Sequence, residues 1–155
     1  MKKIIYLLLI ISSLFVIISC SSTKLNNNQN NKKEEQNKNN SHEVVKSMKA
    51  LIDGKEYIIN LEDNETAKKF VDKLPQELKM TELNGNEKYV NLDYNLPEKS
   101  YYPKQINAGD VMLFGDNCLV IFYKSFNSDF SYTKIGHIDN LPDLGSGNIT
   151  VKFKK

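Results

Sequence analysis

The chain has 155 residues and a formal net charge of +2, and all 21 of its basic residues are lysine. From Ser47 to Lys155, however, 14 lysines are outweighed by 16 acidic residues, so this part carries a net charge of −2. A domain that binds nucleic acid usually has a strong basic excess, and the composition therefore argues against nucleic acid as a partner.

The N-terminus has the layout of an export signal. A basic start at residues 1–3 is followed by an apolar run over residues 4–18, and Ser19 then stands directly before Cys20. This ending resembles the lipobox of bacterial lipoproteins. The resemblance implies that residues 1–19 are a lipoprotein signal peptide and that Cys20 is lipidated. The mature protein is then expected outside the cytoplasm, anchored by its N-terminal lipid to a membrane of the bacterial cell envelope.

Two alternatives for this segment are a retained anchor helix and plain secretion. A spanning helix usually needs about 18 apolar residues or more, whereas this run is shorter and is interrupted by Ser12 and Ser13. An ordinary signal peptide ends at a small-x-small cleavage site, and here a cysteine stands at that place. The lipid anchor is the expectation that fits the residues best.

Residues 20–46, which begin with Cys20, are expected to form a disordered linker. They are rich in asparagine and lysine and have no apolar periodicity, so they cannot bury enough surface to offset the entropy of ordering. Such a chain has a reach of roughly 25–30 Å, enough to hold a domain off the bilayer. His42 lies in this segment, which argues against a catalytic role for it.

Residues 47–155 are expected to form one domain. The runs Ser47–Ile52 and Lys55–Leu61 flank Asp53-Gly54, a strong signal for a tight hairpin. A helix is then expected to begin after Asp63 or Asn64, either of which can cap it. Its apolar stripe has the helical spacing i, i+3, i+4, i+7 before Pro75 ends it, and it consists of Ala67, Phe70, Val71 and Leu74.

The rest of the domain is expected to be sheet, since short apolar or alternating runs are separated by turn residues. Eight short strands with close turns and one helix favour a closed barrel, while a β-sandwich is the competing architecture. Beyond the first hairpin, the expected strands are Leu78–Leu83, Glu87–Leu92, Val111–Phe114, Cys118–Tyr123, Lys134–Ile138 and Ile149–Phe153.

Several motifs in this order resemble the bacterial cyclophilin-like domain family. They cover nearly all of residues 47–155, and the resemblance implies a mainly β fold, the closed eight-stranded barrel of cyclophilins with one short amphipathic helix. It implies little about function, because fold and activity separate easily. The motifs are residues 63–75, Met80, residues 86–89, 109–115 and 117–126, and Tyr132 to Gly136.

The first function to consider from this resemblance is prolyl isomerase activity. In true cyclophilins an arginine hydrogen-bonds the substrate at the prolyl amide, and lysine does not replace its planar fork of donors. This chain contains no arginine and no tryptophan. A non-catalytic module is therefore expected, with a weak or divergent isomerase, or another enzyme using the same cleft, as the alternative.

The sequence gives no convincing sign of other chemistry, and no cofactor or metal is predicted. His137 is isolated, whereas a metal site needs several ligands at matched spacing, so we expect a strand residue that is turned outward or hydrogen-bonded. Cys118 opens an apolar run and is expected to be a small buried hydrophobe. Gly145–Gly147 lacks the context of a phosphate loop and is expected to be a turn.

Aromatic residues on loops are the most suggestive remaining feature. They can line a ligand surface, because tyrosine combines apolar area with a polar tip, or they can cap the open ends of the barrel, which is the interpretation we favour. If they line a cleft, the bound group is expected to be a peptide, a protein or a small ligand. The candidate cleft residues are Tyr101, Tyr102, Phe126, Phe130 and Tyr132, with Met80 and Tyr89 added by analogy with the cyclophilin substrate face.

Overall fold

The computed structural model describes residues 45–155. The predicted signal peptide, the lipidation of Cys20 and nearly all of the predicted linker, including His42, lie outside the described residues. The described part contains the helix α1 (Glu65–Asp72) and the strands β1 (Ser47–Ile52), β2 (Lys55–Leu61), β3 (Gln76–Leu83), β4 (Glu87–Asn91), β5 (Gln105–Ile106), β6 (Asp110–Phe114), β7 (Cys118–Phe122), β8 (Phe126–Asn127), β9 (Thr133–Ile138) and β10 (Ile149–Lys154).

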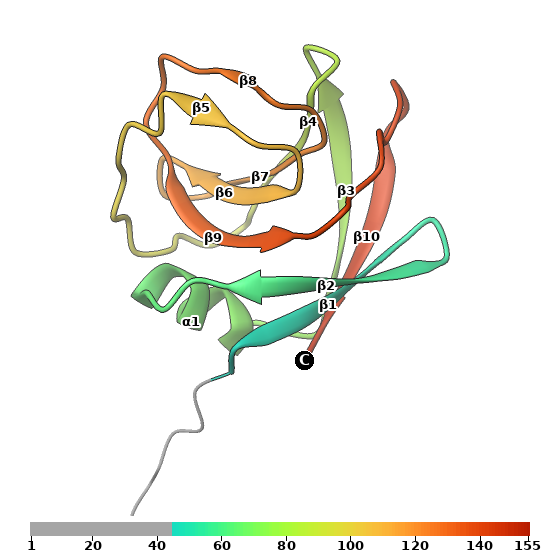
Figure 1. The fold of residues 1–155 in the computed structure, drawn as a ribbon. Coiled ribbons are helices and arrows are strands. Elements are labelled where there is room, and N and C mark those ends of the chain that lie inside the picture. The colour runs from blue at the N-terminus through green and yellow to red at the C-terminus, as the bar shows by residue number, and fades with distance from the viewer. Residues whose placement is uncertain (1–44) are drawn as a thin grey trace, which may run out of the picture. The chain divides into compact units, whose positions relative to one another are not determined.

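Eight of these strands form a closed antiparallel barrel in the order β1-β10-β3-β4-β7-β6-β9-β2 (Figure 1). The barrel closes because β2 pairs with both β1 and β9. Closure leaves no barrel strand with an unpaired edge. The predicted eight-stranded barrel is thus confirmed, and the competing sandwich is excluded. The strands β5 and β8 were not predicted, and they form a separate two-stranded sheet.

The first hairpin shows how the sequence sets the strand register. In β1 the buried residues Met48, Ala50 and Ile52 alternate with more exposed ones, as expected for a strand with one face in the core. Asp53 and Gly54 connect β1 to β2 with φ angles of 48° and 81°. Two positive φ angles in succession are what a type I′ hairpin turn requires.

The helix α1 begins at the second of the two predicted caps. The side-chain oxygen of Asn64 accepts a hydrogen bond of 2.8 Å from the backbone N–H of Ala67, which satisfies one of the free donors of the first turn. Phe70, on the buried face of α1, packs edge-to-face on Phe153 of β10, with 5.4 Å between ring centroids. Between residues 45 and 155, no helix is long and apolar enough to cross a membrane.

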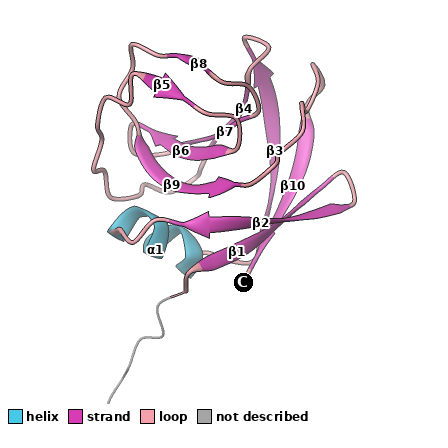
Figure 2. Cartoon of the chain, viewed as in Figure 1, coloured by secondary structure: helices cyan, strands magenta, loops and turns pink. Residues whose placement is uncertain are grey.

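The apolar residues form two separate clusters, one inside the barrel and one on its outer wall. Val111 and Leu113 of β6 belong to the inner cluster, whereas Met112 between them belongs to the outer one. The outer cluster is covered by the segments around β5 and β8, which lie over β6 and β7 (Figure 2). As a result β6 and β7 are buried on both faces. The expectation that the loop aromatics cap the barrel's open ends is therefore wrong for Tyr132, which covers the side wall instead.

Candidate functional site

The outer cluster brings together a connected set of aromatic rings. Phe122 lies at its base, with ring centroids 5.6 Å from Phe126 and 5.5 Å from Tyr132. Tyr132 contacts Phe114 at 5.6 Å, and Phe114 contacts Phe130 at 6.0 Å. The half-buried Tyr89 also packs against this cluster. We call the whole set the outer aromatic surface, and it consists of Tyr89, Phe114, Phe122, Phe126, Phe130 and Tyr132.

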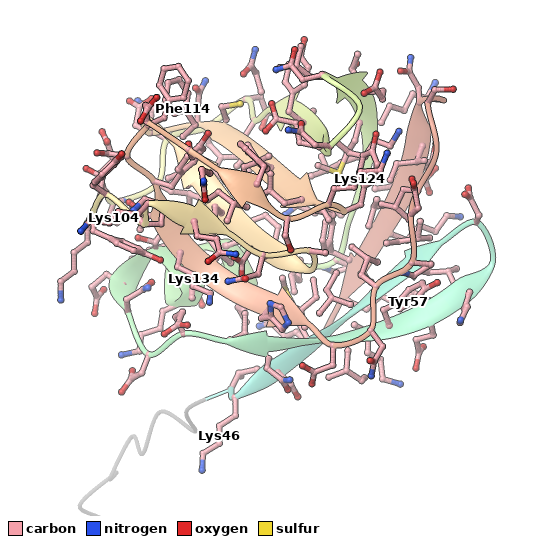
Figure 3. The ribbon with its side chains drawn as sticks, turned by 45° about the horizontal axis from the view of Figure 1, so that its top comes forward. Lys46, Tyr57, Lys104, Phe114, Lys124 and Lys134 are labelled. Atoms are coloured by element: carbon pink, nitrogen blue, oxygen red, sulfur yellow. The ribbon has the colours of Figure 1, made fainter. Side chains whose placement is uncertain are left out.

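The rings at the base of this surface are buried, and the outermost rings are exposed to solvent. Phe122 and Tyr132 have 0% and 6% of their surface exposed, whereas Phe114 and Phe130 have 46% and 61%. Phe114 lies at the margin of the molecule (Figure 3). Two large rings therefore face solvent while the rings beneath them hold them in place. Contiguous exposed aromatic area of this kind is typical of sites that contact another molecule.

The predicted cleft residues have different positions in the structure. Tyr89, Phe126 and Tyr132 lie together in or against the outer cluster, and Phe130 joins them through Phe114. Met80 does not. It is fully buried inside the barrel, because the outward positions of β3 are odd-numbered ones such as Thr81, which pairs with Tyr89 of β4. The addition of Met80 to the cleft is wrong for this reason of strand parity.

The two neighbouring tyrosines of the predicted cleft are tied to the same loops. The backbones of Tyr101 and Tyr132 exchange two hydrogen bonds, of 2.9 and 3.0 Å. The Tyr102 hydroxyl donates a 3.0 Å hydrogen bond to Asp129, the residue before Phe130, and this carboxylate raises the pKa of Tyr102. Both tyrosine side chains are about half exposed. They thus border the segment that carries Phe130.

Sequence reasoning missed the wall residues on which these loops rest. In the sequence, Phe114 and Phe122 are identifiable only as members of strands. The available signal was that the runs Val111–Phe114 and Cys118–Tyr123 are continuously apolar instead of alternating. A continuously apolar strand is covered on both faces, so each run must also support something outside the barrel.

A carboxylate and a thiol share the environment of this surface. Glu87 of β4 stands opposite Phe122 of β7, and burial raises its pKa, with a further contribution from the negative charge of Glu82. Burial likewise raises the pKa of the Cys118 thiol, and the charge of Glu87 adds to the effect. Cys118 is half-buried and packs against the outer cluster. A raised pKa makes it a poor nucleophile, which agrees with a packing role.

A second group of polar residues connects β6 to β9. The buried Asp110 carboxylate accepts hydrogen bonds from His137 Nδ1 at 3.0 Å and from the backbone N–H of Asn107 at 2.9 Å, and it lies 3.2 Å from Lys134 Nζ. The prediction that His137 is a hydrogen-bonded strand residue is confirmed. In residues 45–155, no three His, Cys, Asp or Glu side chains are grouped so that they could hold a metal ion.

A fully buried lysine was not singled out by sequence reasoning. Lys88 of β4 points into the barrel, where its Nζ donates hydrogen bonds to the carbonyl oxygens of Gly145 and Gly147 at 2.5 and 2.6 Å. Its ammonium also lies 4.9 Å from the centroid of the Tyr123 ring. Burial lowers the pKa of Lys88. The lysine ties the loop between β9 and β10 to the barrel.

A cavity of about 210 Å³ lies elsewhere, where β3 and β10 pair. The amide nitrogen of Gln76 is buried there without a hydrogen-bond partner, while its oxygen accepts a bond from the Tyr94 hydroxyl. None of the predicted cleft residues lines this cavity. Its lining residues are Pro75, Gln76, Glu77, Lys152, Phe153 and Lys154.

Comparison with known proteins agrees with the architecture. No curated protein and no solved structure matches the chain significantly. The model of the cyclophilin-like family matches residues 50–154, a span that begins within β1 and ends with β10 and so includes nearly the whole barrel. The match covers well over half of the chain, and the protein therefore belongs to the cyclophilin-like family.

Proposed function

We propose that this protein is a lipid-anchored binding protein of the bacterial cell envelope. Its outer aromatic surface would bind an extended segment of another protein without catalysing a reaction. The observation that carries the proposal is the exposure of Phe114 and Phe130, at 46% and 61%, above a buried base of rings. Covering such rings removes apolar area from water, which favours binding by roughly 25 cal/mol per Å².

The spacing of the rings favours an extended peptide as the bound group. The centroids of the two exposed rings, Phe114 and Phe130, are 6.0 Å apart. In an extended chain, side chains on the same face recur every two residues, at about 6.6 Å. Two apolar side chains on one face of a peptide can therefore each meet one of these two exposed rings. Aromatic residues are also enriched at protein interfaces.

Removing the two exposed rings should abolish most of this binding. The assay is fluorescence anisotropy of the full-length protein in detergent, with the labelled, end-blocked peptide Lys-Ser-Phe-Ser-Phe-Ser-Lys as probe. The double variant Phe114→Ala, Phe130→Ala should weaken binding at least about tenfold, which corresponds to about 1.4 kcal/mol. The matched control is Ile58→Ala on β2, because Ile58 is also 46% exposed.

Two results would contradict the proposal. One is unchanged affinity of the double variant, and the other is an equal loss of affinity in the Ile58→Ala control. Prolyl isomerase activity is tested separately with a protease-coupled proline-peptide assay, where turnover above the uncatalysed rate, lost on removing the same rings, would favour the enzymatic alternative. We expect no such turnover, because no arginine is present to stabilise the twisted amide.

The membrane anchor is tested by changing the predicted lipidation site. Cys20→Ala should leave the barrel folded but move the protein from the membrane fraction of native cells to the soluble fraction or the medium, provided that the variant is still exported. Mass spectrometry of the wild-type N-terminus should find an acylated Cys20 as the first residue. An unmodified Met1 on the native protein would contradict the anchor.

A further inference from the structure

Beside the outer aromatic surface lies one carboxylate, that of Glu87, which has no neutralising partner among residues 45–155. We propose that Glu87 selects a cationic group, the ammonium or guanidinium of a lysine or arginine side chain in the bound segment. This inference rests on the proposed function, since it specifies the chemistry of a ligand at the same surface.

Strand pairing places Glu87 among apolar side chains. It is two residues before Tyr89 on β4, so both side chains project from the same face of the strand. Across the sheet it stands opposite Phe122 of β7 on one side and opposite Leu83 of β3 on the other. Leu83 is 41% exposed, and Phe122 forms the base of the ring set. Glu87 is therefore half-buried between an aromatic and an aliphatic side chain.

Within residues 45–155, no ion pair and no side-chain hydrogen bond includes the Glu87 carboxylate, although several other carboxylates are paired. Asp110 pairs with Lys134 at 3.2 Å, and Glu77 pairs with Lys152 at 3.1 Å. Among the described residues, the carboxylate of Glu82 adds to the effect of burial in raising the pKa of Glu87, and its charge is repulsive. Residues 45–155 thus hold a partly desolvated negative charge and supply no cation for it.

Such a charge has a clear preference among ligands. Burying a charge costs free energy unless the charge is paired. A cation that binds beside Glu87 therefore offsets a desolvation cost that is present in the free protein. The surrounding rings act in the same direction, because the faces of aromatic rings attract ammonium and guanidinium groups. An anionic or purely apolar side chain at this position would leave the cost in place or increase it. The site therefore discriminates by what it rejects as well as by what it attracts.

The test compares two peptides that differ only in charge. The first is the probe used above, with lysine at both ends so that either direction of binding presents a cation. The second carries uncharged norleucine in both places. The full-length wild-type protein should bind the lysine peptide about tenfold more tightly. Glu87→Gln should reduce this difference to less than about twofold by weakening the lysine complex alone.

A control separates local recognition from general attraction between opposite charges. Glu56→Gln removes one negative charge from β2, which is four strands from β4 in the barrel order, and it should leave the preference for lysine intact. Glu87→Gln should not lower the melting temperature at pH 7. The raised pKa of Glu87 means that its charged form disfavours folding at a pH above the folded-state pKa.

The outcomes distinguish this inference from the proposed function. Equal affinity of the wild-type protein for both peptides, or a preference for lysine that survives Glu87→Gln, would overturn the role of Glu87 and leave the binding surface standing. Failure of both peptides to bind would overturn the proposed function and the inference with it. Loss of the preference in Glu56→Gln as well would show that only net charge matters, which also overturns the inference.

Discussion

Replacing Gly109 by alanine should unfold the domain or lower its free energy of unfolding by about 4 kcal/mol or more, a size reached only by severe single substitutions. Gly109 has a φ of 97°, where a side chain is strained. A Cβ there would overlap the carbonyl oxygen of Ile138 and lie 2.9 Å from Cε1 of His137. The obstacle is partly backbone, so a change of rotamer cannot relieve it.

Gly109 also joins three strands of the barrel. Its N–H donates a 2.7 Å hydrogen bond to the carbonyl of Phe122, and its own carbonyl accepts a 2.8 Å bond from the N–H of Ile138. Any shift of this residue away from the overlap breaks one of these bonds. The same shift would separate β6 from β9 and disturb the contact of Asp110 with His137. The expected decrease in the free energy of unfolding is therefore large.

Urea denaturation followed by circular dichroism measures the loss, and Gly147→Ala is the matched control. No atom lies within 4 Å of a Cβ at Gly147, and its φ does not require glycine. The control should change the free energy of unfolding by no more than about 0.5 kcal/mol. If Gly109→Ala were as mild as Gly147→Ala, the close approach of these three strands would be wrong.

Lys88→Ala should give the second large decrease in the free energy of unfolding, about 3 kcal/mol, because truncating a large buried side chain leaves a cavity. The substitution also removes the donor that holds the carbonyls of Gly145 and Gly147. Hydrogen bonds to charged groups stabilise more than neutral ones. Part of the loss is offset, since burial already disfavours the Lys88 charge and lowers its pKa.

Lys88→Met separates these contributions. Methionine restores most of the apolar volume but donates no hydrogen bond, and a buried charge can often be replaced by an apolar side chain at little cost. It should therefore be clearly more stable than Lys88→Ala. In both variants limited proteolysis should cut faster between Gly145 and Gly147, because the loop has lost its tie. Wild-type stability of Lys88→Ala would contradict the buried position of this lysine.

The elements with strong local signals could be predicted from the sequence. The Asp53-Gly54 turn sets the first hairpin, and the stripe containing Phe70 sets the helix, because turn geometry and helical periodicity depend on neighbouring residues. Strand and turn spacing alone is compatible with both a closed barrel and a sandwich, and only the family resemblance distinguishes the two. Which strands pair to close it depends on contacts between distant residues, such as those of β2 with β9.

The candidate site was less predictable because it depends on which face of each strand is outside. Met80 was placed on the wrong face, since a shift of one residue exchanges core and surface. The importance of Phe114 and Glu87 depends on what lies across the sheet from them, which one strand alone does not show. Lys88 resembled an ordinary surface lysine, because its partners come from a loop 57 and 59 residues later in the chain.

The double-sided burial of β6 and β7 has a consequence for how this protein can diversify. Consecutive residues such as Met112 and Leu113 belong to different clusters, so on these strands one set of alternate positions maintains the interior and the other set supports the segments around β5 and β8. Substitutions at the outward positions would then change how these covering segments are held without altering the interior of the barrel. A designer who wished to reshape this covering layer would vary the same outward positions and keep their neighbours fixed.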